Sequence, residues 1–311
     1  MSAAQTRERE SRWALPTALA TLVAVVLIVI SIPLNSVSGT GTAEVLRSTA
    51  AHSGSAATVA LLQGVAFLLL ALPLLYLFNA IRARSDRVRS QLLGLVIAAP
   101  LFLAVSTGLS GVRGHEASDQ FVSGEAKSTL SQKEAREECK SDLKDEGAKE
   151  FAEEFEANEG ENALEACERR KTEDDEASNA LSEASLSPLV TGLGFAGALG
   201  LLIVLFYCCL WGMRTGLLSR FWGSLGMALG IVILLGLLPL ALIWFAYFGL
   251  LIVGKVPGGK PPAWEAGEAI PWPTPGERAA AELEPGEDAE ETPADGPEGA
   301  DGERRKRKRR E

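Results

Sequence analysis

The sequence predicts an all-α membrane protein, a six-span helical bundle with an acidic, helical outer loop and a disordered cytoplasmic tail. Uncharged apolar runs of about twenty residues recur along the chain, and a run of that length crosses a hydrocarbon core of about 30 Å. Arginine residues flank several of these runs, as they do at the cytoplasmic ends of spans. The polar segments hold nearly all the charge, so the net charge of −10 says little about partners until it is divided among them.

The first three spans are predicted within residues 14–111, after a cytoplasmic N-terminus at 1–13. Their apolar runs cover residues 14–34, 57–79 and 91–111. The first run also has features of a secretory signal, because arginines precede it and small residues at 36–38 would suit cleavage. Its apolar part of about nineteen residues is longer than the roughly 7–15 of a signal core, which favours an uncleaved span.

The last three spans are predicted within residues 189–255. A run at 189–211 is followed by a block of 33 residues without charge, at 221–253. One helix of that length would measure about 50 Å, which exceeds the hydrocarbon core by more than helix tilt absorbs. A break near Pro239 gives two short spans, whereas a proline kink would keep the block as one.

Flanking charge favours six spans over five. The loop between the second and third runs carries Arg82, Arg84, Arg87 and Arg89 against one Asp86, which predicts a cytoplasmic loop. With six spans, this loop and both termini lie in the cytoplasm. With five, the basic C-terminal tail would have to cross the membrane.

A long polar loop, residues 112–188, is expected outside the cell. Within it, residues 112–187 hold 22 acidic and 10 basic residues, a net charge of −12. Apolar residues recur at helical spacing in two stretches, 135–155 and 164–184, and the segment 158–160 predicts the break between them. Because both apolar stripes are narrow, we expect a helical hairpin with a small core, or partial disorder.

Cys139 and Cys167 are the two cysteines outside the predicted spans, and both lie in this loop. An extracytoplasmic compartment permits disulfides, so we predict that the two cysteines pair. The alternative is that they are two small buried residues on the helical stripes.

The cytoplasmic tail, residues 256–311, changes composition twice. Its first part is rich in proline, and Trp264 and Trp272 are predicted at the level of the lipid headgroups; a polyproline-type docking segment for a protein partner is the alternative. An acidic part follows and is expected to be disordered. The tail ends in a basic cluster that is predicted to contact anionic lipid: Arg304, Arg305, Lys306, Arg307, Lys308, Arg309 and Arg310. Binding to the acidic part or to nucleic acid are the alternatives, and no specific nucleic acid is expected.

The predicted spans contain few residues of the kinds that carry out catalysis, metal binding or ion transport. No Asp, Glu, Lys or His lies in the middle of a predicted span, which argues against a proton relay or ion-coupled transport. The two histidines, His52 and His115, are too few for a metal site, so no metal or cofactor is expected. No catalytic constellation is present in the pattern of residues, and we therefore predict that the protein is not an enzyme.

Small residues predict close helix packing. The segment 192–197 matches the G-x-G-x-x-G pattern of dinucleotide sites, but that pattern needs a preceding strand, and here a membrane helix begins. Small residues four apart let helices approach closely. The residues predicted to pack in this way are Gly192, Ala196, Gly200, Gly226 and Gly230.

Two stretches, MRTGLLSRFWGSLGMALG at 213–230 and GKVPGGKPPAWEAGEAIPWPTPGE at 254–277, carry a resemblance to known sequences. With them, the segment 213–277 resembles an uncharacterised family of multi-pass membrane proteins of high-GC actinobacteria. The resemblance implies a location in a bacterial plasma membrane and assigns no catalytic residue.

These observations predict an integral plasma-membrane protein that is non-enzymatic and acts through interaction. The expected partners are the lipid bilayer and an unknown protein. A transporter or channel for a small neutral solute is the alternative, because glycine-rich helices permit a pathway. The lack of charge inside the spans weighs against it.

Overall fold

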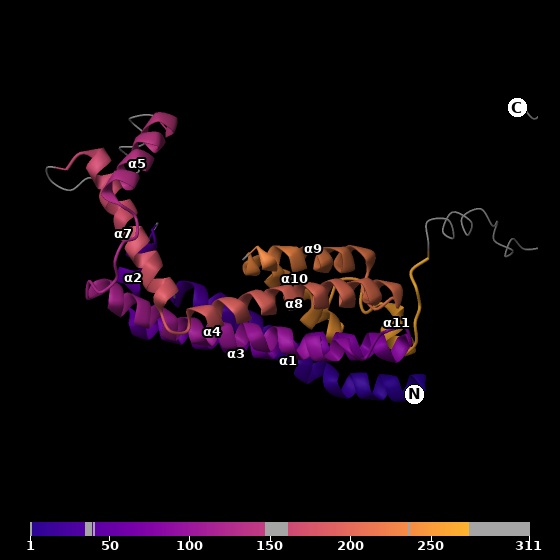
Figure 1. Cartoon of the computed structure of the whole chain (residues 1–311). Coiled ribbons are helices and arrows are strands. Elements are labelled where there is room, and N and C mark those ends of the chain that lie inside the picture. The colour runs from indigo at the N-terminus through magenta and orange to yellow at the C-terminus, as the bar shows by residue number, and fades with distance from the viewer. Residues whose placement is uncertain (1, 35–38, 40, 147–160, 236, 274–311) are drawn as a thin grey trace, which may run out of the picture. The chain divides into compact units, whose positions relative to one another are not determined.

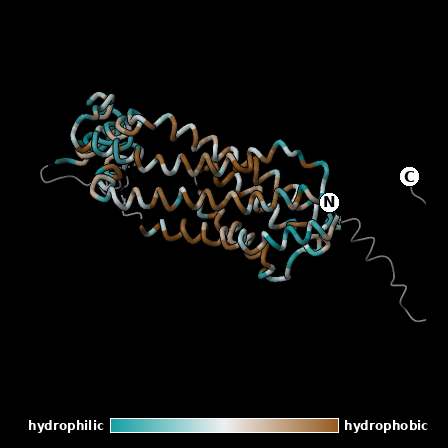
Figure 2. Tube along the Cα trace, turned by 90° about the horizontal axis from the view of Figure 1, so that it is seen from below, coloured by the Kyte–Doolittle hydropathy of each residue, from teal (hydrophilic) through white to brown (hydrophobic). Residues whose placement is uncertain are grey.

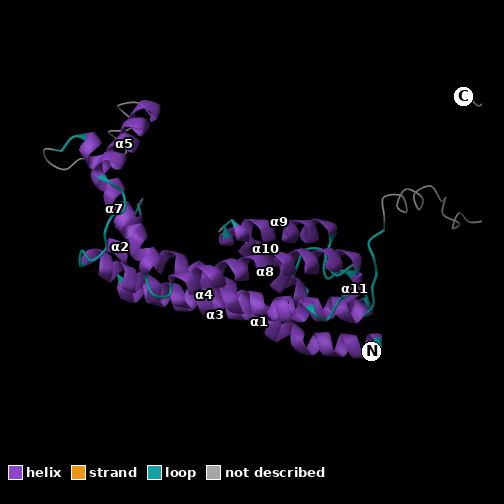
Figure 3. Ribbon diagram, viewed as in Figure 1, coloured by secondary structure: helices purple, strands orange, loops and turns teal. Residues whose placement is uncertain are grey.

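The computed structural model describes residues 2–34, 39, 41–146, 161–235 and 237–273, and α-helices are the regular elements of these residues (Figure 3). The helices are α1 (Ala3–Leu34), α2 (Thr42–Ala51), α3 (Ser53–Arg84), α4 (Leu92–Val122), α5 (Gln132–Glu146), α7 (Ala163–Glu183), α8 (Ser187–Arg214), α9 (Arg220–Leu234), α10 (Leu238–Val253) and α11 (Pro262–Ala266). The predicted all-α class is therefore confirmed for the described part of the chain.

Four helices in the described part of the chain are long and apolar enough to cross a membrane. They are α1, α3, α4 and α8, with 32, 32, 31 and 28 residues. At 1.5 Å per residue each measures about 42–48 Å, which is longer than the hydrocarbon core. The helices therefore continue past the apolar runs into polar sequence, so that α1 begins at Ala3 and α4 ends at Val122.

The uncharged block at 221–253 forms a helical hairpin. Helix α9 ends at Leu234 and α10 begins at Leu238, just before Pro239, whose missing N–H is no loss in a first helical turn. The rings of Trp222 and Tyr247 stack with centroids 3.5 Å apart. The two helices therefore run antiparallel, with the N-terminal end of α9 beside the C-terminal half of α10. With 15 and 16 residues, they measure about 22–24 Å, less than the thickness of a hydrocarbon core.

The six apolar helices form a closed ring. Contacts join α1 to α3, α3 to α4, α4 to α8, α8 to α9, α9 to α10, and α10 back to α1 (Figure 1). The C-terminal ends of α3 and α8 lie at the same end of the ring, where Arg89 N–H donates to the Tyr207 hydroxyl across 3.3 Å. Because Arg82, Arg84 and Arg214 also lie there, we call this the arginine end.

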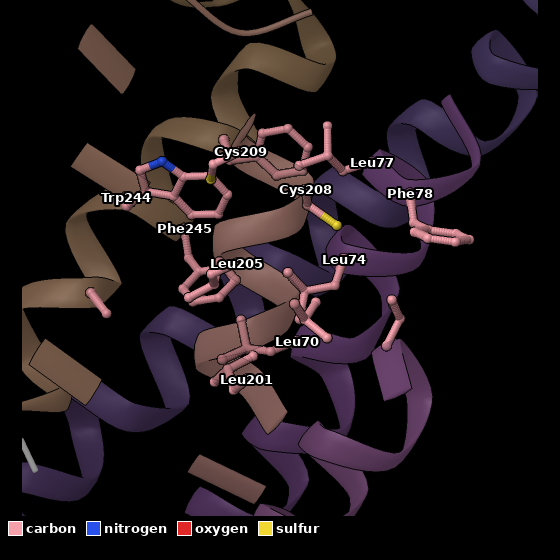
Figure 4. Close-up of a cluster of buried hydrophobic side chains, with 14 of the residues drawn as sticks. Leu70, Leu74, Leu77, Phe78, Leu201, Leu205, Cys208, Cys209, Trp244 and Phe245 are labelled. Carbon is pink, nitrogen blue, oxygen red and sulfur yellow. The ribbon is translucent and has the colours of Figure 1, made fainter. Parts of the chain in front are cut away.

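Side chains fill the interior of the ring. Leucines of α3 meet leucines and two cysteines of α8, and aromatic side chains of α10 lie on the other side of α8 (Figure 4). The labelled residues of this cluster are Leu70, Leu74, Leu77, Phe78, Leu201, Leu205, Cys208, Cys209, Trp244 and Phe245, each at most 2% exposed. Packing of this kind holds helices together in lipid, where van der Waals contact replaces the hydrophobic effect.

Glycines bring α8 close to α4 on a face that differs from the predicted one. Gly192 and Ala196 are exposed, and the space around Gly192 is open, so Gly192 makes no close helix contact within the described chain. Gly194, Gly197 and Gly200 face α4 instead, and a Cβ on Gly197 would lie 2.9 Å from the backbone nitrogen of Leu103. The contact face follows steps of three residues, whereas the prediction used steps of four.

Helix α9 packs on α8 through its own glycines. A Cβ on Gly226 would lie 2.4 Å from the Cys209 sulfur, and one on Gly230 would lie 3.4 Å from the Cα of Leu202. These short distances leave no room for a larger side chain at Gly226. The hairpin is therefore seated against α8 along most of α9.

A polar unit, which we call the head, lies at the end of the ring opposite the arginine end. It consists of α2, α5 and α7 together with the C-terminal turns of α4, and a small core of Ala43, Leu46, Ala117, Ala177 and Ala180 joins α2, α4 and α7. Hydropathy follows this arrangement: hydrophobic residues line the ring, and hydrophilic residues gather at its two ends (Figure 2).

Some predictions concern residues outside the described part. Residues 273–311 form a second unit, of which the structure describes only Pro273. The acidic part of the tail and the basic cluster at 304–310 lie outside the described residues. So do Phe151, Phe155 and the predicted break at 158–160.

Candidate functional sites at the two ends of the bundle

A buried ion pair joins α1 to α3 at the arginine end. The Arg84 side chain is 0% exposed and Glu10 is 12% exposed, and the Arg84 Nη2 donates to Glu10 Oε2 across 2.9 Å while Nη1 pairs with Oε1. The guanidinium also donates to the carbonyls of Ala263 and Ala80. Burial of a charge is tolerated only when it is paired and its hydrogen bonds are satisfied, as they are here.

Trp264 covers this ion pair. Its indole stacks on Tyr76 at 5.6 Å between ring centroids, and the Arg84 guanidinium lies 5.4 Å from its ring. The indole N–H donates to the Leu217 carbonyl across 2.9 Å. Residues 256–272 are thus folded back across the arginine end, and we call them the cap.

The cap changes the interpretation of the two tail tryptophans. Trp264 is 6% exposed and belongs to the core of the ring, and its position at the level of the lipid headgroups stays a prediction. Trp272 is half-buried, and its N–H donates to the Leu218 carbonyl across 2.8 Å. Each indole N–H donates a hydrogen bond to a carbonyl in the loop between α8 and α9. Composition alone does not reveal that these carbonyls need donors.

The stretch at 213–230 meets residues 256–272 of the second stretch in this cap. Besides the two indole bonds, Ile270 N–H donates to the Thr215 carbonyl across 3.2 Å. Gly216 has a positive φ of 78°, and a Cβ there would lie 1.9 Å from the Ile270 carbonyl oxygen, so only glycine fits. The turn after α8 and the cap are therefore one packed structure.

Lys260 is the one basic residue of the cap. Burial lowers the pKa of Lys260, and the negative charges of Glu10 and Glu265 offset part of this effect.

At the opposite end, a disulfide joins two helices of the head. Cys139 of α5 and Cys167 of α7 are bonded, with their Cα atoms 6.0 Å apart. Ala166 is buried beside them, and Leu143 and Leu164 pack around the bond. The other two cysteines, Cys208 and Cys209, are free thiols buried in the ring.

Two neighbouring aspartates of α7 hold the rest of the head. Asp174 accepts a bond from the backbone N–H of Ala43 across 2.8 Å, in the first turn of α2, where a negative charge is favoured. Asp175 accepts bonds from the segment 128–130, and the backbone N–H of Leu130 is the main reason why the pKa of Asp175 lies below its usual value. The lowered pKa of Asp175 keeps this carboxylate ionised at neutral pH, so its bonds persist there.

Ion pairs bridge the head helices at its surface. Arg47 of α2 lies 2.8 Å from Glu173, and Lys171 of α7 lies 2.8 Å from Asp142 of α5. Such pairs contribute at most about 1 kcal/mol each. The disulfide and the aspartate bonds therefore do more than the ion pairs to make the head rigid.

The described residues contain no group of three His, Cys, Asp or Glu side chains arranged to hold a metal ion. His115 pairs with Asp119 at 2.9 Å, and His52 lies between α2 and α3, where its Nδ1 is 3.1 Å from the Ser48 carbonyl.

Comparisons with protein-family models, with curated proteins and with solved structures give no match to the chain. The resemblance of residues 213–277 to an actinobacterial family stays a prediction. The two ends of the bundle, described above, are the basis for assigning a function.

Sequence reasoning missed the Arg84–Glu10 pair and the cap. The available signals were Glu8 and Glu10, two acidic residues among the arginines that precede the first span, and it is Glu10 that pairs with Arg84. Its partner lies 74 residues away in the sequence, and local patterns do not connect the two.

Proposed function

We propose that the chain is a six-span protein of a bacterial plasma membrane that acts through interaction with another protein and with lipid, and not by catalysis. The head would lie outside the cell, and the arginine end, with the cap, in the cytoplasm. The positive-inside rule supports this orientation, because Arg82, Arg84, Arg89 and Arg214 gather at one end.

The construction of the head is the observation that carries the proposal. A disulfide, two aspartate-centred hydrogen-bond sets and several ion pairs hold three short helices on the end of α4. Such bracing keeps a surface in one conformation, which lowers the entropic cost of binding a partner. The disulfide also suits an extracytoplasmic head.

Helix α5 presents an exposed face of the head that carries charges of both signs. Its buried side carries Ala135 and Cys139, whereas Glu134 and Glu137 are exposed. Hydrogen bonds from Ser131 lower the pKa of Glu134, so this residue is ionised at neutral pH. Lys133, Arg136 and Lys140 are also exposed on this helix, so a partner with charges of both signs would match this face.

The filled ring favours interaction over the transport of a solute. Large side chains from α3, α8 and α10 occupy its interior (Figure 4). A solute path would need a polar lining through this region, and the side chains there are apolar.

Site-specific photo-crosslinking in living cells tests the proposal. A photoreactive amino acid at Ser141, an exposed and uncharged position on α5, should give a protein adduct of discrete mass. The matched control is Ile231, 53% exposed on α9, which should give no protein adduct because it faces lipid. Glu134→Gln with Glu137→Gln should weaken the Ser141 adduct. If Ser141 and the other exposed α5 positions give no adduct while reconstituted protein carries solute across vesicles, the proposal fails.

A further inference from the structure

A pocket of about 290 Å³ lies between α1 and α3 at the arginine end. Its lining residues recur at steps of three and four along each helix, so one face of α1 and one face of α3 form the walls. The pocket lies beside the Arg84–Glu10 pair, because Glu10 and Tyr76 contribute to its wall. The residues of the head do not line this pocket.

The pocket is polar at one end and apolar at the other. Arg9 and Asn79 line the part nearer the arginine end, and Trp13, Leu75 and Leu72 line the deeper part. The two helices run antiparallel, so polarity falls in the same direction along both walls. From Ala83 to Leu72 the wall of α3 is about 16 Å long, enough for a headgroup and the upper part of an acyl chain.

Two polar side chains of the pocket lack partners. Asn79 is half-buried in a membrane helix, and its amide has no hydrogen-bond partner among the described residues. The exposed guanidinium of Arg9 makes no ion pair within the described part of the chain. The negative charge of Glu10 is already matched by Arg84. The pocket therefore offers a cation and an amide to an anionic group.

We propose that this pocket binds one anionic phospholipid. The Arg9 guanidinium and the Asn79 amide would hold its phosphate, and one acyl chain would lie along Trp13, Leu75 and Leu72. The pocket borders the lipid, since Trp13 is 55% exposed and Leu72 is 38% exposed on the flanks of the ring. The orientation proposed above places this lipid in the inner leaflet, but binding itself does not depend on that orientation.

Native mass spectrometry of the full chain in detergent tests the proposal. The probes are phosphatidylglycerol and phosphatidylcholine with identical acyl chains, and inorganic phosphate as a competitor. We expect one phosphatidylglycerol to be retained in preference to phosphatidylcholine. Arg9→Gln should weaken its binding about tenfold, the usual effect of losing a charge-assisted hydrogen bond. Asn79→Leu should also weaken it, and Ala83→Trp, at an exposed position of the wall, should block the pocket.

Arg12→Gln is the matched control, because Arg12 is exposed on α1, pairs with Glu8 and does not line the pocket. It should leave retention unchanged. Three results would overturn the proposal: equal retention of both lipids by the unaltered protein, equal weakening by Arg9→Gln and Arg12→Gln, or displacement of the lipid by inorganic phosphate.

Discussion

Arg82 and Arg84 are two residues apart at the end of α3, yet they have different surroundings. Arg82 is exposed, whereas the Arg84 side chain is fully buried between Glu10 and the cap. Residues two apart project to different sides of a helix, so only one of them can face α1. The positive-inside rule treats both arginines alike, because it concerns charge near a membrane and not contacts within the protein.

Arg84→Gln should destabilise the bundle, and Arg82→Gln should not. Loss of Arg84 leaves Glu10 largely buried without its cation and removes the guanidinium donors of the Ala263 carbonyl, a change that costs about 3 kcal/mol. Arg82→Gln should change the free energy of unfolding by less than about 0.5 kcal/mol. Denaturant titration in detergent micelles measures both effects.

Glu10→Gln combined with Arg84→Gln provides the check on the cause. If electrostatics explain the loss, the double variant should be more stable than Arg84→Gln alone, because neither charge then lacks a partner. Equal stability of the Arg82 and Arg84 variants would contradict the assignment of the ion pair.

At the scale of elements, sequence patterns locate the long helices well and the contacts between them poorly. Apolar runs follow directly from the thickness of lipid, so the runs at 57–79 and 189–211 lie inside α3 and α8. Helix α2 was not predicted, because ten residues with one buried leucine give a weak pattern. The contact face of α8 was also missed, because glycines at several spacings coexist and only the neighbouring helix selects among them.

The α5–α7 pair should depend on its disulfide. The bond closes a segment with a sequence separation of 28, which corresponds to about 3–4 kcal/mol in the loop-entropy model. Cys139→Ser with Cys167→Ser should therefore make the head unfold at lower temperature and expose α5 to proteolysis. Dithiothreitol should do the same to the unaltered protein and should have no further effect on the double variant.

Alkylation of the denatured protein provides a direct count of free thiols. Without reductant, we expect two modified cysteines, Cys208 and Cys209, and after reduction all four. Four modified cysteines without reductant would show that the disulfide does not form in the cell.

At the scale of the whole molecule, the side of the membrane on which each terminus lies depends on whether the number of crossings is even or odd. Helices α9 and α10 are shorter than the hydrocarbon core, and their apolar tip is exposed, with Leu235 at 69% and Leu237 at 53%. Whether this hairpin crosses fully or turns within the membrane, its antiparallel packing returns the chain to the side where α9 begins. The Arg84–Glu10 pair and the cap join the N-terminal turns to residues 256–272. Residues 2–13 and the cap therefore lie on one side of the membrane in either case.

Paired reporters should show this parity and the orientation together. Alkaline phosphatase fused after residue 285, which leaves the cap intact, should be inactive, and the same enzyme inserted after residue 158 in the head segment should be active. A fluorescent protein that folds only in the cytoplasm should give the opposite pattern at both positions. Two active phosphatase fusions would place the head and the tail on the same side of the membrane, which requires an even number of spans between them, and the cap could not then reach Glu10. Activity at 285 alone would leave the fold intact and reverse the orientation, which would also remove the external head from the proposed function.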